Sequence, residues 1–567
     1  MGSVIIMDNI KVRLLEGRNL HGEGNLIYLR VDIKNYREEL LRVIHHYIKV
    51  EEKLSLKSYI NILEKDNALE ALISSNNIYL SNKVIKAIIN NSDEESIVNE
   101  FKNVNDEEWS KKIHDIAIRN NIPYTRINDE EIILGYCKNS FELKKDEYIS
   151  VYKEDCCKVF DNISKKVNDI PIISVTGTNG KTTTVRLIHK ILLDLGYKSG
   201  LASTGGIYIG DKAIKYGDTT GFYSAREVLK NKEVDIAVLE TARGGILKKG
   251  LGYKGAKVGI ITSISEDHIG MENIRSINDL IDIKSLIADE LSDDGILIIK
   301  SIPELVDRFR IKSNVILFND FKDELITNHI KNGNIAYYIK DNYIVKNKCG
   351  YEEKIIAINE IPFAFYGASK SNVRNVMVAI IAVEYIHKNI SPIIDVVKKL
   401  ECNIYTNLGR QNIIDFNDFK MIIDYGHNGE AFREVFNIAK SMKSKRIIGV
   451  ITAAGDREDK YIKELGEIAS KYCDEIIIKE QPDLRGRLKG ETAELLKEGA
   501  LENGYNIKKI KVILKEEDAI LYSLRSANSG DIIVSFSQFL YLTFPVINKF
   551  REEIGLEKIG EDLDLTH

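Results

Sequence analysis

The sequence of 567 residues lacks the features that mark membrane and secreted proteins. No run approaches the roughly 18 apolar residues of a membrane span, and the first residues show no basic segment followed by an apolar signal core. The six cysteines include no C-x-x-C pair, which argues against a zinc site or a disulfide framework. These absences predict a cytoplasmic protein with no membrane partner.

Long stretches of one charge are also missing. The 80 Lys and Arg residues and 85 Asp and Glu residues give a net charge of −5 and form no extended basic block, so nucleic acid is excluded as a partner. No internal repeat, low-complexity tract or heptad pattern stands out. Hydrophobic residues at 44% and charged residues at 29% are typical of a globular protein, and the length predicts three or four domains.

One stretch carries a specific chemical signal, the segment S-V-T-G-T-N-G-K-T-T-T at 174–184. An apolar run that breaks into glycines, then Lys-Thr, then a helical pattern is typical of a phosphate-binding loop. A glycine turn that binds no nucleotide would not require Lys181 and Thr182, so we favour the nucleotide site. The residues expected to contact the nucleotide here are Thr178, Asn179, Gly180, Lys181, Thr182 and Thr183.

Two further apolar strands end in polar groups. Residues 234–240 end in Glu240, and the strand at 258–264 leads to His268. In an open α/β sheet the carboxyl ends of parallel strands meet at one edge, which is also where the phosphate loop opens. A following helix at 277–290 carries Lys284. The sequence therefore predicts that these side chains converge near the phosphates.

The patterning predicts an α/β protein with three domains. Residues 1–165 suggest a small α+β domain, with strands at 27–33 and 131–136 and helices at 36–48, 68–73, 81–89 and 109–119. Residues 166–405 alternate strands and helices, as a doubly wound and mostly parallel sheet does, with an antiparallel elaboration at 313–363. Residues 406–567 suggest a third, Rossmann-like α/β domain.

The short loop T-G-T-N-G-K-T-T resembles the Mur ligase superfamily of ATP-dependent amide-forming enzymes. Longer motifs at 217–226, 239–247, 424–428, 455–457 and 483–487 resemble the C-terminal, Mur-like half of cyanophycin synthetases. Arg18-Asn19 and the segment 133–138 resemble the N-terminal domain of the same enzymes. About 30 residues separate Lys138 from the strand at 172, too few for the ATP-grasp domain that those synthetases carry there.

This resemblance implies ATP and Mg²⁺ as cofactors and assigns roles around the phosphates. Thr182, Glu240 and His268 would hold metal, and Lys284 would be a carbamylated catalytic lysine beside the catalytic Lys181, Glu240 and His268. A satisfied loop histidine is the alternative for His268, since imidazole is an unusual Mg²⁺ ligand. A solvated helix lysine is the alternative for Lys284.

The resemblance also places the rest of the nucleotide. Asn372 and Asn375 open a long helix near the adenine, Arg410 reaches a phosphate and Asp424 reaches the ribose. An ordinary surface charge is the alternative for the last two. The sequence departs from the family pattern at Gly429, where proline is usual.

A third group of residues is assigned to the substrates. The acceptor carboxylate would lie near the loop at 219–226, and arginines would anchor carboxylates in two-point geometry, although structural ion pairs would explain Arg243 and Arg485 equally well. The candidate substrate residues are Thr219, Thr220, Ser224, Arg226, Arg243, His427, Asp456, Arg457, Arg485 and Arg487.

The expected function is an ATP-dependent carboxylate–amine ligase that works through an acyl phosphate. Its partners would be a small-molecule or peptide carboxylate acceptor and an amino acid, with arginine suggested by the resemblance. One alternative is an inactive nucleotide-binding scaffold or regulatory subunit that works with a separate ATP-grasp enzyme. Another is a P-loop NTPase that couples hydrolysis to motion. Self-association as a homo-oligomer stays open, because this superfamily often assembles.

Overall fold

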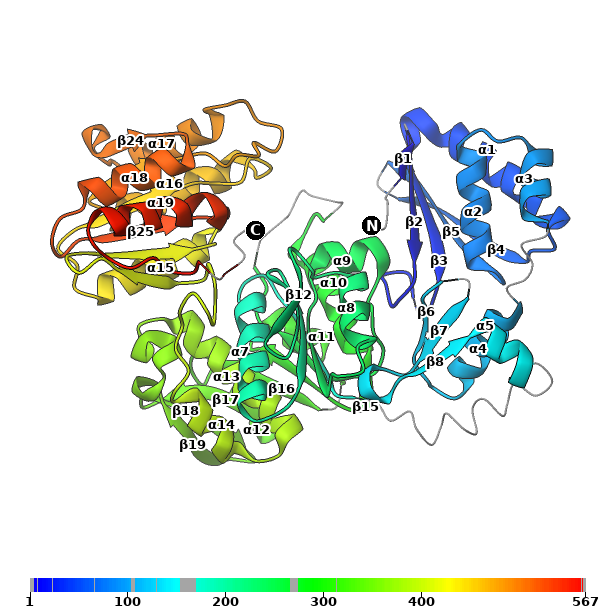
Figure 1. Cartoon of the computed structure of the whole chain (residues 1–567), viewed down its shortest axis with the longest axis horizontal. Coiled ribbons are helices and arrows are strands. Elements are labelled where there is room, and N and C mark those ends of the chain that lie inside the picture. Colours follow the sequence, from blue (N-terminus) through cyan, green and yellow to red (C-terminus); the bar gives the residue numbers. More distant parts are fainter. Residues whose placement is uncertain are drawn as a thin grey trace.

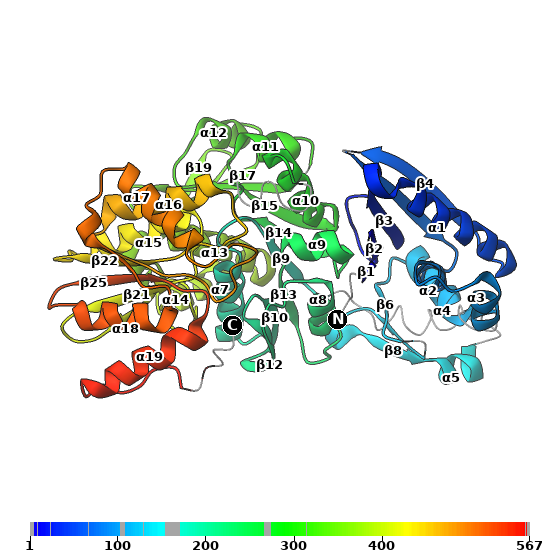
Figure 2. The same ribbon diagram turned by 90° about the horizontal axis from the view of Figure 1, so that it is seen from above.

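The computed structural model describes residues 5–7, 9–22, 24–65, 67–102, 108–128, 130–152, 170–265, 274–312, 314–561 and 563. In both views the middle of the chain lies between the N-terminal and C-terminal parts (Figures 1 and 2). No helix within these ranges is long and apolar enough to cross a membrane.

The N-terminal unit is an antiparallel sheet of five strands in the order β1-β2-β3-β5-β4. Its strands are β1 (Ile5–Met7), β2 (Ile10–Leu15), β3 (Leu26–Asp32), β4 (Ser58–Lys65) and β5 (Ala68–Ser75). The helices packed on it are α1 (Ile33–Lys53), α2 (Ile78–Ile89) and α3 (Glu94–Phe101). Apolar side chains of the strands and of these helices form a single core.

The helix predicted at 68–73 is wrong, because this stretch forms β5. Ala, Leu and Glu favour helices locally, yet Leu69, Ala71 and Ile73 alternate along the strand and are buried in the core. Glu70 points to the other face of the sheet and accepts hydrogen bonds from side chains of β3. Pairing with β3 and β4 on either side therefore overrides the local preference.

A second, smaller sheet follows. It contains β6 (Tyr124–Arg126), β7 (Glu131–Leu134) and β8 (Phe141–Lys144), with α4 (Glu108–Arg119) and the short α5 (Lys145–Glu147) beside it. Tyr136 and Cys137, just after β7, are buried in the core of the middle sheet. This segment therefore joins the N-terminal part to the middle of the chain.

The middle of the chain is organised around an eleven-stranded sheet in the order β12-β11-β10-β13-β9-β14-β15-β16-β17-β18-β19. Its strands are β9 (Ile172–Thr176), β10 (Ser199–Ser203), β11 (Gly206–Ile209), β12 (Lys212–Tyr216), β13 (Ile236–Glu240), β14 (Ala256–Ile261), β15 (Leu291–Lys300), β16 (Val315–Asn319), β17 (Ile335–Lys340), β18 (Tyr343–Lys348) and β19 (Tyr351–Ala357). The strands from β10 to β17 in this order pair in parallel, and only the two edges are antiparallel.

Helices cover both faces of this sheet, which confirms the predicted doubly wound fold. One face carries α7 (Lys181–Asp194), α13 (Lys370–His387) and α14 (Ile390–Val397). The other carries α8 (Phe222–Leu229), α9 (Arg243–Lys249), α10 (Ile277–Asp289), α11 (Pro303–Arg308) and α12 (Glu324–Lys331). β9 lies between β13 and β14, so the ends of these three strands are neighbours. The antiparallel elaboration begins only after β17, because β16 and β17 are still parallel.

The C-terminal unit is an α/β sheet in the order β20-β21-β25-β22-β23-β24, parallel except for β20. Its strands are β20 (Asn412–Asp415), β21 (Lys420–Asp424), β22 (Ile447–Ile451), β23 (Glu475–Ile478), β24 (Ile510–Val512) and β25 (Ile532–Phe536). The helices α15 (Gly429–Ser441), α16 (Asp459–Tyr472) and α17 (Glu491–Glu502) pack on one face, and α18 (Glu516–Ser526) and α19 (Leu540–Glu553) on the other.

Candidate nucleotide and ligation site

The loop between β9 and α7 is shaped by two glycines. Gly177 has φ of +146° and Gly180 has φ of +85°, a region that side-chain-bearing residues rarely adopt. A Cβ on Gly177 would lie 2.0 Å from Thr262 Oγ1, so the loop runs directly against the end of β14. The Thr178 N–H also donates to the Ser263 carbonyl at 2.9 Å. The loop therefore keeps a fixed shape at the centre of the sheet edge.

Lys181 begins α7, and its ammonium lies inside the curl of the loop. Its Nζ donates to the carbonyls of Gly177 and Thr178, each at 3.0 Å. The N-terminus of α7 points at the same place, and a helix N-terminus favours anions. The arrangement can receive the phosphates of a nucleotide.

Glu240 ends β13 beside this loop and is only 3% exposed. Its Oε1 accepts hydrogen bonds from Thr182 Oγ1 and Thr204 Oγ1, both at 3.0 Å, and its Oε2 accepts one from the Thr204 N–H at 2.9 Å. The expected approach of Thr182 to Glu240 is therefore present. Sequence reasoning missed Thr204, although its place just after β10, the strand next to β13, was a signal.

Lys284 lies on α10 and is 4% exposed. Its Nζ donates to Thr178 Oγ1 of the phosphate loop at 2.9 Å. The alternative of a solvated helix lysine is wrong, because the side chain is buried against the loop. Its carbamylation stays a prediction. His268 lies outside the described residues.

A cleft of about 850 Å³, including its open mouth, continues from the phosphate loop toward the C-terminal unit. Asn372 and Asn375 line it from α13, and the Asn375 Nδ2 donates to Asn372 Oδ1 at 3.3 Å. Lys300 and Phe318 line it from the ends of β15 and β16. Burial lowers the pKa of Lys300, and the nearby charge of Arg374 lowers it further. The cleft has the mixed polar and apolar lining of a nucleoside site.

The C-terminal unit supplies the opposite wall of this cleft, including Arg410, Asp424 and His427. The Asp424 carboxylate accepts the N–H groups of Gln411 at 2.9 Å and Gly426 at 2.6 Å, and burial raises its pKa. The Arg410 guanidinium stacks on the Tyr425 ring at 4.2 Å. The structure thus brings predicted nucleotide residues of both units into one cleft, although Thr178, Lys181 and Thr182 of the loop are not part of its lining.

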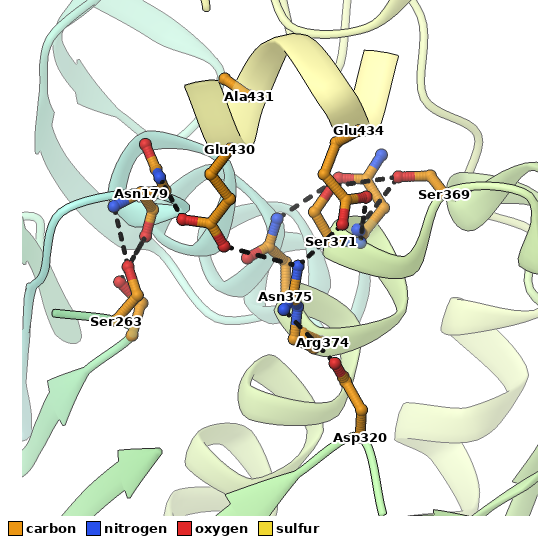
Figure 3. A network of polar contacts seen from close by, with 12 residues as sticks. Asn179, Ser263, Asp320, Ser369, Ser371, Arg374, Asn375, Glu430, Ala431 and Glu434 are labelled. Atoms are coloured by element: carbon orange, nitrogen blue, oxygen red, sulfur yellow. Dashed lines mark hydrogen bonds and ion pairs between the residues drawn. The ribbon is translucent and has the colours of Figure 1, made fainter. Parts of the chain in front are cut away.

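The start of α15 closes over the phosphate loop (Figure 3). Asn179 Nδ2 donates to Glu430 Oε2 at 2.7 Å, and its Oδ1 accepts from Asn428 Nδ2 at 2.9 Å. One turn later, Glu434 Oε1 accepts from the Arg374 guanidinium of α13 at 3.2 Å. Two elements more than 240 residues apart in sequence are therefore held together at the mouth of the cleft.

The predicted substrate residues in the middle unit do not all lie at one site, because Arg226 lines a cleft other than the nucleotide cleft. Thr219 and Thr220 are buried after β12, where Thr219 Oγ1 donates to the Ser203 carbonyl at 2.6 Å. Ser224 lies in the first turn of α8, and Arg243 begins α9 directly after the Glu240 strand. The Arg226 guanidinium stacks on Phe222 at 4.2 Å and lines a different cleft, shared with the N-terminal sheets. Arg226 is therefore separated from the nucleotide cleft.

The predicted substrate residues in the C-terminal loops contact one another. Arg485 Nη1 pairs with Asp456 at 3.0 Å. The Arg487 guanidinium donates to the carbonyls of Gly455 and Arg457, each at 2.7 Å, and thereby joins the loops after β22 and β23. These contacts give Arg487 a structural task, and its contact with a substrate stays a prediction.

Within the described ranges, no cluster of three His, Cys, Asp or Glu side chains could hold a metal ion. The oxygen atoms of Thr182 and Glu240 would suit a hard cation that completes its coordination with phosphate and water oxygens. The chemistry of these two donors fits Mg²⁺.

A phosphate loop at the centre of a parallel sheet, faced by a second α/β unit across a nucleoside-sized cleft, defines a two-lobed P-loop nucleotide-binding protein. Family models agree with this class: the Mur ligase middle domain matches residues 175–383, and the Mur ligase, glutamate ligase domain matches residues 409–539. Together these matches cover more than half of the chain, and the chain belongs to the Mur ligase superfamily.

Individual relatives are similar over the same part of the chain. The cyanophycin synthetase of Geminocystis herdmanii is 34% identical over 385 residues, which is 67% of this chain and 44% of that protein. The chain thus spans less than half the length of the curated cyanophycin synthetases it matches. The UDP-N-acetylmuramoyl-L-alanyl-D-glutamate--2,6-diaminopimelate ligase of Wolinella succinogenes is 26% identical, covering 60% of this chain and 75% of its own. The solved structure of E. coli FolC in complex with ADP aligns with a TM-score of 0.48 and 18% identity, over 70% of this chain and 98% of that one.

Proposed function

We propose that this chain is an ATP- and Mg²⁺-dependent ligase that joins a carboxylate to an amine through an acyl phosphate. The observation that carries the proposal is the meeting of three contacts at one loop, two of them buried. Lys181 lies inside the loop, Glu240 is bonded to Thr182, and Lys284 is bonded to Thr178. Membership of the Mur ligase superfamily and similarity to cyanophycin synthetases support the same reaction class.

The chemistry explains why such a site is needed. A carboxylate is a poor electrophile, so one of its oxygens attacks the γ-phosphorus, and ADP leaves. The amine nitrogen then attacks the acyl carbon, loses a proton, and inorganic phosphate leaves. Lys181 and the loop N–H groups balance the charge that develops on the phosphate oxygens. Mg²⁺, held by Thr182 and Glu240 with His268 as the third predicted ligand, would add charge neutralisation at those oxygens.

The position of Lys284 fits a role between the phosphate loop and the acceptor. Its Nζ is within hydrogen-bonding distance of the loop at Thr178, on the sheet edge that Glu240 also reaches. We infer that Lys284, carbamylated as in the Mur ligases it resembles, orients the acceptor carboxylate. Thr220 lies beside the segment that follows Glu240, because its carbonyl accepts the Ala242 N–H at 3.3 Å, and we propose Thr219, Thr220 and Arg243 as acceptor contacts.

Similarity to cyanophycin synthetases suggests an acidic acceptor and arginine as the amine. Only about 30 residues separate Lys138 from β9, too few for the ATP-grasp domain of those synthetases, so we infer that the acceptor is made elsewhere, as a small acid or a peptide. We also infer domain boundaries near residues 165 and 405, because the three large sheets fall on either side of them.

The test is the release of ADP from ATP and Mg²⁺ with a panel of acidic acceptors and amino acids, followed by mass spectrometry of the product. The expected result is ADP release that requires both an acceptor carboxylate and an amine, with an amide product. A Lys181→Ala variant is the negative control. ADP release that needs neither substrate would favour the NTPase alternative, and ATP binding without turnover would favour the scaffold alternative.

A further inference from the structure

Both polar atoms of the Asn179 side chain contact the C-terminal unit. Its Nδ2 donates to Glu430 and its Oδ1 accepts from Asn428. The backbone of the same residue is used as well, because its N–H donates to Ser263 Oγ and its carbonyl accepts from Thr262 Oγ1. The phosphate loop is thus attached to β14 through the backbone of Asn179 and to α15 through its amide group.

The contact on α15 lies directly behind the nucleotide wall. Asn428 caps α15 by accepting the Ala431 N–H at 3.0 Å, and only three residues separate it from Asp424 at the end of β21. Any shift of this first turn relative to the phosphate loop would therefore move Asp424 relative to the nucleotide. A side chain that fixes the turn also fixes the ribose end of the site.

A second contact acts on the same helix. Arg374 of α13 lies 3.2 Å from Glu434, 3.9 Å from Glu430 and 3.4 Å from Asp320 (Figure 3). The Ser371 N–H also donates to Glu434 at 3.2 Å. Two carboxylates on successive turns of α15 therefore bind to the middle unit. Glu430 accepts from the phosphate loop, and Glu434 accepts from α13.

We propose that Asn179 is a positioning residue, whose amide seats the C-terminal unit over the nucleotide through Glu430 and Asn428, rather than a side chain that binds phosphate. This inference rests on the proposed ligase function for its activity readout, although its docking readout does not need turnover. An amide is the right group, because it donates to a carboxylate with one atom and accepts from Asn428 with the other.

The test is a pair of nearly isosteric substitutions. Asn179→Asp places a carboxylate against Glu430, so the two like charges repel and the contact opens. Glu430→Gln keeps a carbonyl that can accept from the native Asn179. In the double variant Asn179→Asp/Glu430→Gln, the glutamine amide donates to the new aspartate, which still accepts from Asn428. The matched control is Glu467→Gln on α16. The Glu467 carboxylate pairs with the Lys471 ammonium at 2.6 Å and takes no part in the contact of Asn179.

Two measurements are made on each variant. Small-angle scattering without nucleotide reports docking of the C-terminal unit, and kcat at saturating ATP reports the reaction. We expect Asn179→Asp to increase the radius of gyration and to lower kcat by about tenfold or more. The double variant should return to the values of Glu430→Gln, and Glu467→Gln should match the native protein.

The outcomes separate this inference from the proposed function. A double variant as slow as Asn179→Asp would overturn the inference, because a carboxylate that acts on phosphate is not relieved by a change at residue 430. An unchanged radius of gyration in Asn179→Asp would overturn it too. If the native protein shows no turnover with any acceptor, the proposed function fails, while the scattering of the four variants still decides the docking role.

Discussion

Glu240→Gln is the substitution that separates folding from function most clearly. The Glu240 carboxylate is buried and receives three hydrogen bonds, two from the hydroxyls of Thr182 and Thr204 and one from the Thr204 N–H. A glutamine amide can place its oxygen toward the Thr204 N–H and its NH₂ toward the hydroxyls, which can rotate to accept. The geometry of the site therefore survives without the negative charge.

The expected magnitudes for folding and activity differ. In Glu240→Gln the three hydrogen bonds change from charge-assisted to neutral, and each change lowers the free energy of unfolding by about 1 kcal/mol. The penalty for burying a charge disappears at the same time and offsets part of this loss. The free energy of unfolding should therefore change by less than about 2 kcal/mol. The metal ion on the triphosphate would lose one of its anionic protein ligands. Losing a preorganised charge of this kind raises the activation free energy by about 3 kcal/mol, which lowers kcat more than a hundredfold.

The assay is ADP release at varied Mg²⁺, with chemical denaturation of the same preparations. Glu233→Gln, an exposed glutamate paired with Lys198 before β13, is the matched control and should behave like the native protein. Turnover of Glu240→Gln within threefold of native, at any Mg²⁺ concentration, would refute the reasoning that this carboxylate holds the metal.

Three other outcomes are expected. Arg487→Ala should remove the contacts that join the loops after β22 and β23, and limited proteolysis should cleave the loop at 481–490 faster at an almost unchanged melting temperature. Burial lowers the pKa of His189 to about 4, so the unfolded chain binds more protons than the folded one between that pH and about 6.5. The free energy of unfolding should therefore fall by about 3 kcal/mol as the pH drops from about 6.5 to about 4. Urea denaturation of His189→Gln should lack this part of the pH dependence. Lys479→Met leaves the buried Glu516 carboxylate without its cation, 2.5 Å away, and should destabilise the fold by about 3 to 5 kcal/mol, whereas Lys479→Met/Glu516→Gln should recover most of that loss in the same assay.

Local patterns predicted the parts of this protein that are decided locally. The apolar run before Gly177, the glycine spacing and the Lys-Thr pair fixed the strand, the loop and the helix, since each depends on neighbours in sequence. The strand ending in Glu240 was also recognisable from its buried, β-branched character. The rule that ligands gather at the carboxyl ends of parallel strands predicted that Glu240 lies near the phosphate loop.

The one wrong helix and the contacts that were not foreseen have a common cause, which is that they depend on segments distant in sequence. The stretch 68–73 has helix-forming residues, and only its pairing with β3 and β4 makes it a strand. The partner of Asn179 lies on α15, more than 240 residues away, so a pattern around the loop could assign the amide only to a nucleotide. The contacts of Arg487 with backbone carbonyls were likewise not foreseen, because no sequence pattern marks those carbonyls.

The far edge of the middle sheet has a practical use. Its last turn, between β18 and β19, carries Cys349, the exposed thiol among the cysteines of the described ranges, whereas Cys137, Cys402 and Cys473 are buried. Five strand spacings separate β18 from β9, about 24 Å at the usual interval. A maleimide dye or a surface tether attached there would leave the catalytic edge untouched, so single molecules could be immobilised and observed while they work.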